Sequence, residues 1–171
     1  MIIKLMLGDI TQSNTDCIVN AANTKLLFGS GVCGAIFRAA GIDELQKECD
    51  KLSPIKTGEA VITNGYNLKA KYIIHTAGPI YNNKNDSIYL RNSYYNSLKL
   101  ATNYNLKSIA FPSISTGIYG YPIKDAASVA INAIYEFFND YKNSSIDIVY
   151  FYLFDNNTYN IYKEELEKRN G

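Results

Sequence analysis

The sequence carries no excess of charge of either sign. Its 171 residues include 17 lysines and arginines against 16 aspartates and glutamates, which gives a formal net charge of +1. Proteins that grip duplex nucleic acid displace its counterions with a clustered basic excess. The near balance therefore argues against duplex nucleic acid as a partner and indicates that any bound nucleotide is small.

Cysteine is scarce, and long apolar runs are missing. Cys17, Cys33 and Cys49 form no CxxC pair and have no spacing typical of a zinc site. Their odd number suits a reducing compartment. No apolar run reaches the roughly 20 residues of a membrane span, and the opening MIIKLMLGD is not followed by a signal-peptide cleavage pattern. We therefore expect a cytoplasmic protein with no metal site and no membrane partner.

Hydrophobic residues are plentiful, at 47% of the chain, and they fall into alternating strand-like and helix-like segments. This order predicts an α/β fold with a mostly parallel sheet and helices on both faces, because parallel neighbours need crossover connections. With no linker or internal repeat, residues 1–171 are expected to form one domain. The predicted strands are 2–7, 17–19, 60–63, 72–75, 108–111 and 146–154, and the predicted helices are 33–52, 90–101, 124–138 and 157–168.

Polar and glycine-bearing segments follow four of these strands. In such folds ligands bind beyond the carboxyl ends of the strands, so these segments are expected to meet at one rim. Together they supply a carboxylate, side-chain amides, backbone donors and aromatic faces, which suits a nucleoside diphosphate. The segments are Gly8-Asp9-Ile10, Asn20-Ala21-Ala22-Asn23, the run from Ser113 to Gly120, and Leu153-Phe154-Asp155.

The stretch FGSGVCGAIFR, at residues 28–38, places three glycines before a predicted helix. Glycines allow a close backbone approach, and a helix that begins near Cys33 presents free N–H donors to an anion. A second loop, Ser115 to Gly120, precedes the helix that Pro122 starts, and its amides can grip the same anion. Each loop alone could be only a tight turn, but the pair predicts a diphosphate clamp.

Other polar residues allow two interpretations. Asp9 either caps the turn after its strand or accepts a hydrogen bond from an exocyclic amine of a base. Asn20 and Asn23 either satisfy buried backbone or bond ribose hydroxyls, and we favour the ligand role for Asn23 only. His75, the sole histidine, lies in YIIHTAGP on an expected buried strand, so we interpret it as a core histidine.

Six motifs in order make the chain resemble the macrodomain family, whose members bind ADP-ribose and in many cases remove it from proteins. The resemblance spans nearly the whole chain and implies a three-layer α/β/α sandwich around a mixed, mostly parallel sheet, with no cofactor. The motifs are GDIT at 8–11, DCIVNAAN at 16–23, GSGVCGAIFRAAG at 29–41, TGEAVITNGY at 57–66, IIHTAGP at 73–79 and FPSISTGIYGYP at 111–122.

The resemblance also implies roles for individual residues. Asp9 would take the adenine amine and the Ile10 backbone the ring edge, while Phe154 would pack on the base with Asp155 nearby. Asn23 would hold the distal ribose. The diphosphate would lie between Gly29, Ser30, Gly31, Val32 and Cys33 on one side and Ser115, Thr116, Gly117, Ile118 and Tyr119 on the other. Asn23, Gly31 and Tyr119 are the residues expected at the reacting centre.

Two positions depart from the hydrolytic branch that the chain otherwise resembles. That branch carries Asp where Cys33 stands and His where Phe37 stands. The GVC pattern is, however, similar to alphavirus macrodomains, which hydrolyse mono-ADP-ribosylated proteins. A helix N-terminus lowers a thiol pKa, but a bound phosphate beside Cys33 would disfavour the thiolate, so we do not favour Cys33 as a nucleophile.

The expected function is therefore binding of ADP-ribose, with hydrolysis of mono-ADP-ribose esters on acidic side chains and of O-acetyl-ADP-ribose. ADP-ribosylated proteins are the expected partners, and the protein is expected to be a monomer. Two alternatives stay open: an ADP-ribose reader without turnover, which the residues at 33 and 37 favour, and a hydrolase of ADP-ribosylated nucleic-acid bases, which the near-neutral charge disfavours.

Overall fold

A six-stranded mixed sheet forms the middle layer of the protein, as seen in a computed structural model that describes residues 1–82 and 84–170. The strand order is β1-β6-β5-β2-β4-β3, and neighbours are parallel except for the antiparallel β3–β4 pair. The predicted mixed, mostly parallel sheet is confirmed. The strands are β1 Ile2–Leu7, β2 Cys17–Ala22, β3 Ala60–Asn64, β4 Tyr72–Ala77, β5 Ser108–Phe111 and β6 Ile148–Leu153.

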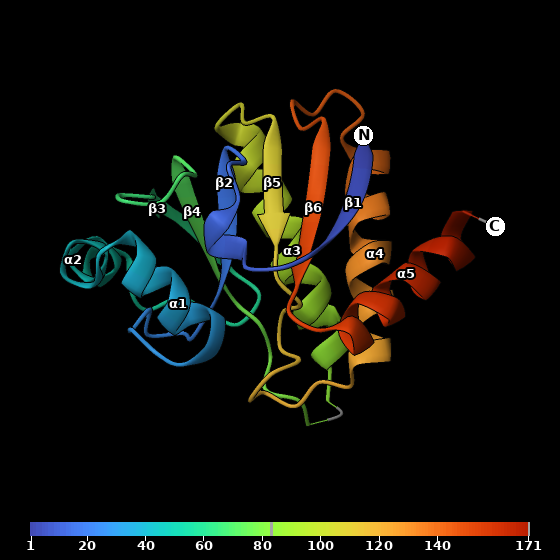
Figure 1. The fold of residues 1–171 in the computed structure, drawn as a ribbon, viewed down its shortest axis with the longest axis horizontal. Coiled ribbons are helices and arrows are strands. Elements are labelled where there is room, and N and C mark those ends of the chain that lie inside the picture. The colour runs from blue at the N-terminus through green and yellow to red at the C-terminus, as the bar shows by residue number, and fades with distance from the viewer. Residues whose placement is uncertain (83, 171) are drawn as a thin grey trace.

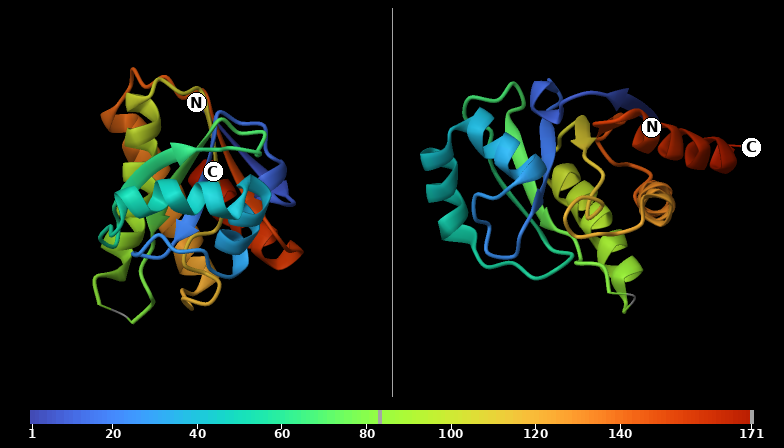
Figure 2. Two further views of the ribbon diagram at one scale, coloured as in Figure 1. Left: turned by 90° about the vertical axis from the view of Figure 1, so that its left-hand side faces the viewer. Right: turned by 60° about the horizontal axis from the view of Figure 1, so that its bottom comes forward.

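Helices cover both faces of the sheet (Figure 1), so the predicted three layers are also confirmed. The first two helices lie over one face and the other three over the opposite face, as the turned views in Figure 2 show. Within the described residues, no helix is long and apolar enough to cross a membrane. The helices are α1 Gly31–Ala40, α2 Ile42–Leu52, α3 Asp86–Asn103, α4 Ile123–Asp140 and α5 Asn156–Asn170, and a 3-10 turn, η1, covers Ile10–Gln12.

The central strands are buried on both faces, which is why they read as nearly continuous apolar runs. In β2, Val19 joins the core under α3, α4 and α5, whereas Ile18 joins the core under α1 and α2. One face of α4 packs into the first of these cores, because Ala127, Ala130, Ile134 and Phe137 are all fully buried. Burial of this kind stabilises the fold by about 25 cal/mol for each Å² of apolar surface removed from water.

The predicted single helix over residues 33–52 is wrong. The structure has two helices that meet at Gly41, whose φ of 115° no helix can contain. Its N–H closes α1 on the Phe37 carbonyl, and its carbonyl accepts the N–H of Leu45 in α2. Apolar periodicity runs through both helices, so the pattern alone did not reveal the bend.

The second strand was predicted too short. It continues past Val19 to Ala22, and Asn20 therefore lies within β2, opposite His75 of β4, with no exposed surface. The last strand was predicted too long, since β6 covers Ile148–Leu153. Strand ends are poorly specified by local sequence because pairing with neighbours decides where the ladder stops.

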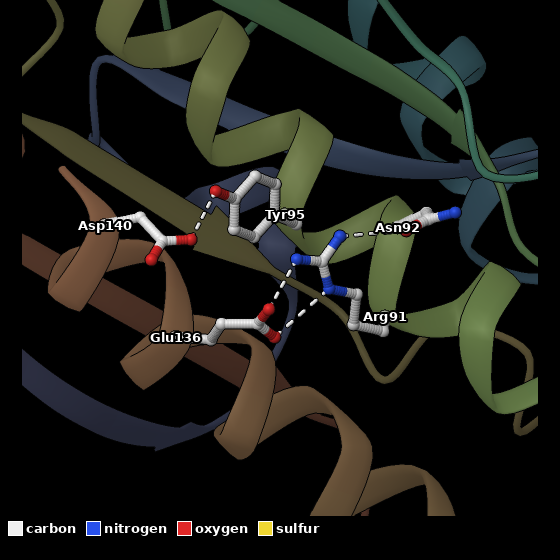
Figure 3. A network of polar contacts seen from close by, with 5 residues as sticks. All are labelled: Arg91, Asn92, Tyr95, Glu136 and Asp140. Carbon is white, nitrogen blue, oxygen red and sulfur yellow. Dashed lines mark hydrogen bonds and ion pairs between the residues drawn. The ribbon is translucent and has the colours of Figure 1, made fainter.

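A surface network ties α3 to α4 (Figure 3). Arg91 of α3 makes two hydrogen bonds to the Glu136 carboxylate, at 2.6 and 3.1 Å, and its guanidinium lies 3.9 Å from the centre of the Tyr95 ring. The Tyr95 hydroxyl donates to Asp140 at 2.7 Å. Because these groups are partly exposed, such an ion pair contributes at most about 1 kcal/mol to stability. The network holds two helices together behind the sheet.

Candidate ligand-binding cleft

A cleft of about 260 Å³ opens at the carboxyl ends of the central strands, where ligands of α/β proteins bind. The loops that form it follow β2, β4 and β5 and lie at the lower edge of the sheet in Figure 1. Ten of the predicted site residues line it, so both predicted loops border one cavity. The lining residues are Ala21, Ala22, Asn23, Gly29, Ser30, Gly31, Val32, Cys33, Gly78, Ser113, Ile114, Ser115, Gly117, Ile118 and Tyr119.

The glycine loop ends in the first turn of α1. The helix begins at Gly31, two residues before the predicted start, with Ser30 at the N-cap and no hydrogen bond from the Ser30 side chain. The N–H groups of that first turn have no intrahelical partner and carry the positive end of the helix dipole. Gly31 has a φ of 59°, a conformation that side chains with a Cβ rarely adopt. The loop therefore presents a bare anion-binding backbone to the cleft.

The second loop forms the facing wall. Ser115 has a φ of 68°, and its carbonyl accepts the N–H of Tyr121 at 2.9 Å, which folds the loop back on itself. The Ser115 hydroxyl is buried and has no hydrogen-bond partner among the described residues. The Thr116 hydroxyl, in contrast, donates to Ser113 and lies outside the lining of the cleft. The Ser115 hydroxyl is thus a buried polar group of this wall without a protein partner in the part of the chain that the structure describes, and the Tyr119 side chain lines the same wall.

Asn23 lines the cleft beside Gly29, and both ends of its side-chain amide are anchored. Its Nδ2 donates to the Leu27 carbonyl at 2.8 Å, and its Oδ1 accepts the Leu27 N–H at 3.0 Å. Each amide end keeps one further hydrogen-bonding position, because the nitrogen has two protons and the oxygen two lone pairs. Asn23 can therefore hold a polar ligand group without losing its orientation.

The four residues predicted for the adenine end lie together but outside the lining of the cleft. They follow β1 and β6, which are parallel neighbours that end at the Leu7–Leu153 pair, and Gly8 N–H donates to the Leu153 carbonyl at 2.9 Å. Phe154 is 63% exposed, so its ring is open to a base, whereas Ile10 is buried. A shared edge of the sheet thus brings two chain segments about 145 residues apart into one place.

Both carboxylates of this end already cap backbone. Asp9 Oδ1 accepts hydrogen bonds from the Thr11 N–H at 2.9 Å and hydroxyl at 2.8 Å, and Asp155 Oδ1 accepts the Thr158 N–H at 2.7 Å. The capping interpretation of Asp9 is therefore present in the structure. Within the described residues Asp9 Oδ2 makes no hydrogen bond, so the same carboxylate can also accept from a ligand.

Burial keeps the titratable groups near the cleft neutral. It raises the pKa of the Cys33 thiol, although the Asn20 side chain and the Gly29 backbone partly offset the rise. It also raises the pKa of the Tyr119 phenol. Neither group supplies a charge at neutral pH, and the raised thiol pKa agrees with our view that Cys33 is not a nucleophile.

His75 belongs to the core, as predicted. It is fully buried, and burial lowers its pKa to about 3, so the imidazole is neutral. Its ring nitrogens lie 2.9 Å from Thr63 Oγ1 and 3.1 Å from Asn20 Nδ2. Sequence reasoning missed that Asn20 and Thr63 meet on this histidine. The strand register Asn20–His75 would have revealed the pair, but it was not available before the sheet was known.

Comparisons with known proteins agree with this geometry. The model of the Macro domain family matches residues 19–130. A macro domain-containing protein of Caldanaerobacter subterraneus is 47% identical and covers 97% of this chain and 98% of its own. The ADP-ribose glycohydrolase MACROD2 of Xenopus laevis is 49% identical over 94% of this chain, which corresponds to 39% of that longer protein.

Solved structures show the same fold. The Oceanobacillus iheyensis macrodomain with ADP superposes with a TM-score of 0.91 at 44% identity, over 96% of this chain and 90% of that one. The Trypanosoma brucei macrodomain in complex with ADP-ribose superposes with a TM-score of 0.89 at 38% identity, over 96% and 68%. With a family model across more than half of its length and close relatives across nearly all of it, this chain belongs to the Macro domain family.

Proposed function

We propose that this protein binds ADP-ribose and hydrolyses mono-ADP-ribose esters on acidic side chains of proteins, with O-acetyl-ADP-ribose as a related ester substrate. One observation carries the proposal: a single cleft is lined by the first turn of α1 with its free N–H groups, by residues of the Ser115–Tyr119 loop, and by the anchored Asn23. A diphosphate fits the two loops, and a ribose fits the amide. The protein acts as a cytoplasmic monomer in this proposal.

The adenine end of the ligand is assigned to the edge where β1 and β6 finish. Asp9 Oδ2 accepts from the exocyclic amine, the Ile10 backbone takes the ring edge, and the exposed Phe154 ring packs on the base with Asp155 nearby. The cleft and this edge lie at the same ends of a parallel sheet. One extended dinucleotide-like ligand can therefore span both.

Hydrolysis relies on positioning. Water, held by the α-phosphate and a loop carbonyl near Gly31, attacks the anomeric carbon of the distal ribose as the bond from that carbon to the carboxylate oxygen breaks, and the proton that the water loses passes to solvent. Asn23 orients the ribose, Tyr119 flanks it, and the backbone donors stabilise negative charge that develops as the carboxylate leaves. The products are ADP-ribose and a free acidic side chain. Because the lining residues of the cleft include no Asp or Glu, we expect turnover to be slow.

That same observation favours a second candidate, a reader that binds ADP-ribose without turnover. Cys33 is a neutral thiol, and Phe37 is 1% exposed and packs on Phe28 and His75 rather than in the cleft. Neither position supplies a carboxylate or an imidazole to the reaction. A third candidate, release of ADP-ribose from nucleic-acid bases, has less support because the chain has a net charge of only +1.

The deciding experiment is incubation with a protein that carries mono-ADP-ribose on glutamate, with mass-spectrometric measurement of free ADP-ribose. Release above the no-enzyme rate, reduced more in kcat than in affinity by Asn23→Ala, supports the hydrolase. Tight ADP-ribose binding with no release from the modified protein would exclude the ester hydrolase. A parallel incubation with ADP-ribosylated single-stranded DNA tests the third candidate.

A further inference from the structure

A chain of buried hydrogen bonds runs behind the cleft, and it starts at Thr63 on the edge strand β3. The Thr63 hydroxyl donates to the Asn64 carbonyl at 3.1 Å, so its oxygen acts as acceptor toward His75 Nε2 at 2.9 Å. A neutral imidazole has one donor and one acceptor nitrogen. Cys49 Sγ also lies 3.9 Å from Nε2, but the Thr63 oxygen is the nearer partner, so Thr63 places the His75 proton on Nε2 and leaves Nδ1 as an acceptor.

Asn20 continues the chain with a fixed direction. Its Nδ2 donates to His75 Nδ1 at 3.1 Å and to Cys33 Sγ at 3.7 Å, while its Oδ1 is buried without a partner among the described residues. Turning the amide over would bury two unpaired N–H donors in place of one unpaired oxygen. The tautomer of His75 thus decides whether the nitrogen or the oxygen of the Asn20 amide contacts Cys33.

The chain ends on the peptide group that anchors Asn23. The Cys33 thiol donates to the Leu27 carbonyl at 3.6 Å, and the same carbonyl accepts from Asn23 Nδ2 at 2.8 Å. The Leu27 N–H holds the other end of the Asn23 amide. Cys33 contacts both Asn20 and Leu27, so a change in the orientation of Asn20 reaches Asn23 through two intermediate residues, Cys33 and Leu27.

We propose that Asn20, oriented by His75 and Thr63, is a positioning residue that sets the Asn23 amide against the distal ribose of ADP-ribose. A buried oxygen without a partner destabilises a fold, and a leucine of similar volume would avoid that loss. The presence of Asn20 is therefore explained by the hydrogen bonds that its Nδ2 makes to His75 and Cys33. The inference rests on the proposed function only in taking Asn23 as the contact to the distal ribose.

The test compares two ligands that differ by that ribose. Calorimetry of Asn20→Leu should show ADP-ribose binding weakened about fivefold, the worth of one neutral hydrogen bond, with the Kd for ADP changed less than twofold. Equal losses for both ligands would mean that Asn20 only supports the fold, and unchanged affinity for both would also overturn the inference. Thermal unfolding of the variant accompanies each titration.

Two valines give a milder, matched comparison. Thr63→Val removes the acceptor for His75 and should weaken the binding of ADP-ribose but not the binding of ADP. Thr76→Val makes the same change at a buried β4 hydroxyl that donates to the Glu59 carbonyl and does not belong to the chain of hydrogen bonds. It should change the affinity for neither ligand. If both valine variants showed the same ratio of ADP-ribose affinity to ADP affinity, the hydrogen-bond chain would have no specific role in positioning Asn23.

A double variant tests the route through Asn23. In Asn20→Leu combined with Asn23→Ala, the loss of ADP-ribose affinity should equal that of Asn23→Ala alone, because Asn20 would have nothing left to orient. Additive losses would overturn the route. None of these measurements depends on hydrolysis. If the protein proved to be a reader, the proposed reaction would be wrong, but the role of Asn20 would still be decided by the affinities for ADP-ribose and ADP.

Discussion

Gly34 of α1 lies directly against the backbone of Gly29: a Cβ at position 34 would come within 2.5 Å of the Gly29 carbonyl oxygen. The helix and the glycine loop are therefore packed as one unit. We predict that Gly34→Ala lowers the free energy of unfolding by about 1 to 3 kcal/mol, as overpacking does, and weakens ADP-ribose. Gly8→Ala, where a Cβ meets no atom within 4 Å, is the control for urea denaturation. Equal stability of the two variants would contradict the close packing.

The anion-binding role assigned to Gly31 predicts a difference between two isosteric variants. Asn and Asp both tolerate the φ of 59° at this position, and a Cβ there meets no atom within 4 Å. Gly31→Asp adds a like charge beside the diphosphate, so its affinity for ADP-ribose should be at least about tenfold below that of Gly31→Asn. Calorimetry measures this ratio and circular dichroism checks the fold. Similar affinities would place the diphosphate elsewhere.

Asp9→Asn should weaken the binding of ADP-ribose and of AMP by the same factor, because both ligands carry the adenine. The substitution keeps an oxygen to cap Thr11 but removes the charge that favours an amine, a loss of about 1.5 to 3 kcal/mol. Asp155→Asn, which changes the other capping carboxylate of this edge, should cost less. Titration of both variants with both ligands checks the assignment. A loss confined to ADP-ribose would move Asp9 away from the base.

Cys33→Asp should increase kcat for release of ADP-ribose from a modified glutamate. The side chain at this position lies 3.6 Å from the Leu27 carbonyl and lines the cleft, so a carboxylate there can orient water near the distal ribose. The same charge repels the diphosphate, and KM should rise with kcat. Cys33→Asn separates charge from shape in steady-state assays. If the wild type released nothing and Cys33→Asp released ADP-ribose readily, the native protein would be a reader.

Protonation of His75 should make the fold less stable in mild acid. Burial lowers its pKa from 6.5 to about 3, so below pH 6.5 the unfolded chain binds a proton that the folded chain refuses. Stability is complete above pH 6.5 and falls as the pH drops toward 3, by about 1 kcal/mol between pH 6.5 and 5.5. Urea unfolding at these two values measures the loss, and His75→Gln should abolish it because the chain has no second histidine.

Much of this architecture follows from local sequence, but its long-range contacts do not. The turn at Gly41 is invisible to apolar periodicity because α1 and α2 bury faces that continue each other's pattern. The burial of Asn20 depends on the strand register that sets it opposite His75. Likewise, an exposed Phe154 gains meaning only when β6 lies beside β1. Loop glycines were informative because their conformation is a local property.

Because β1 pairs with β6, the sheet can be completed only late in the synthesis of the chain. Ile2 pairs with Ile148, so β1 has no neighbour in the sheet until β6 has been synthesised. On a ribosome that adds about 5 to 20 residues each second, the residues that line the cleft, the last of which is Tyr119, are synthesised seconds before β6 is complete. The core on which the second loop rests includes Phe151 and Tyr162, so this core closes only after the last strand and helix have been made.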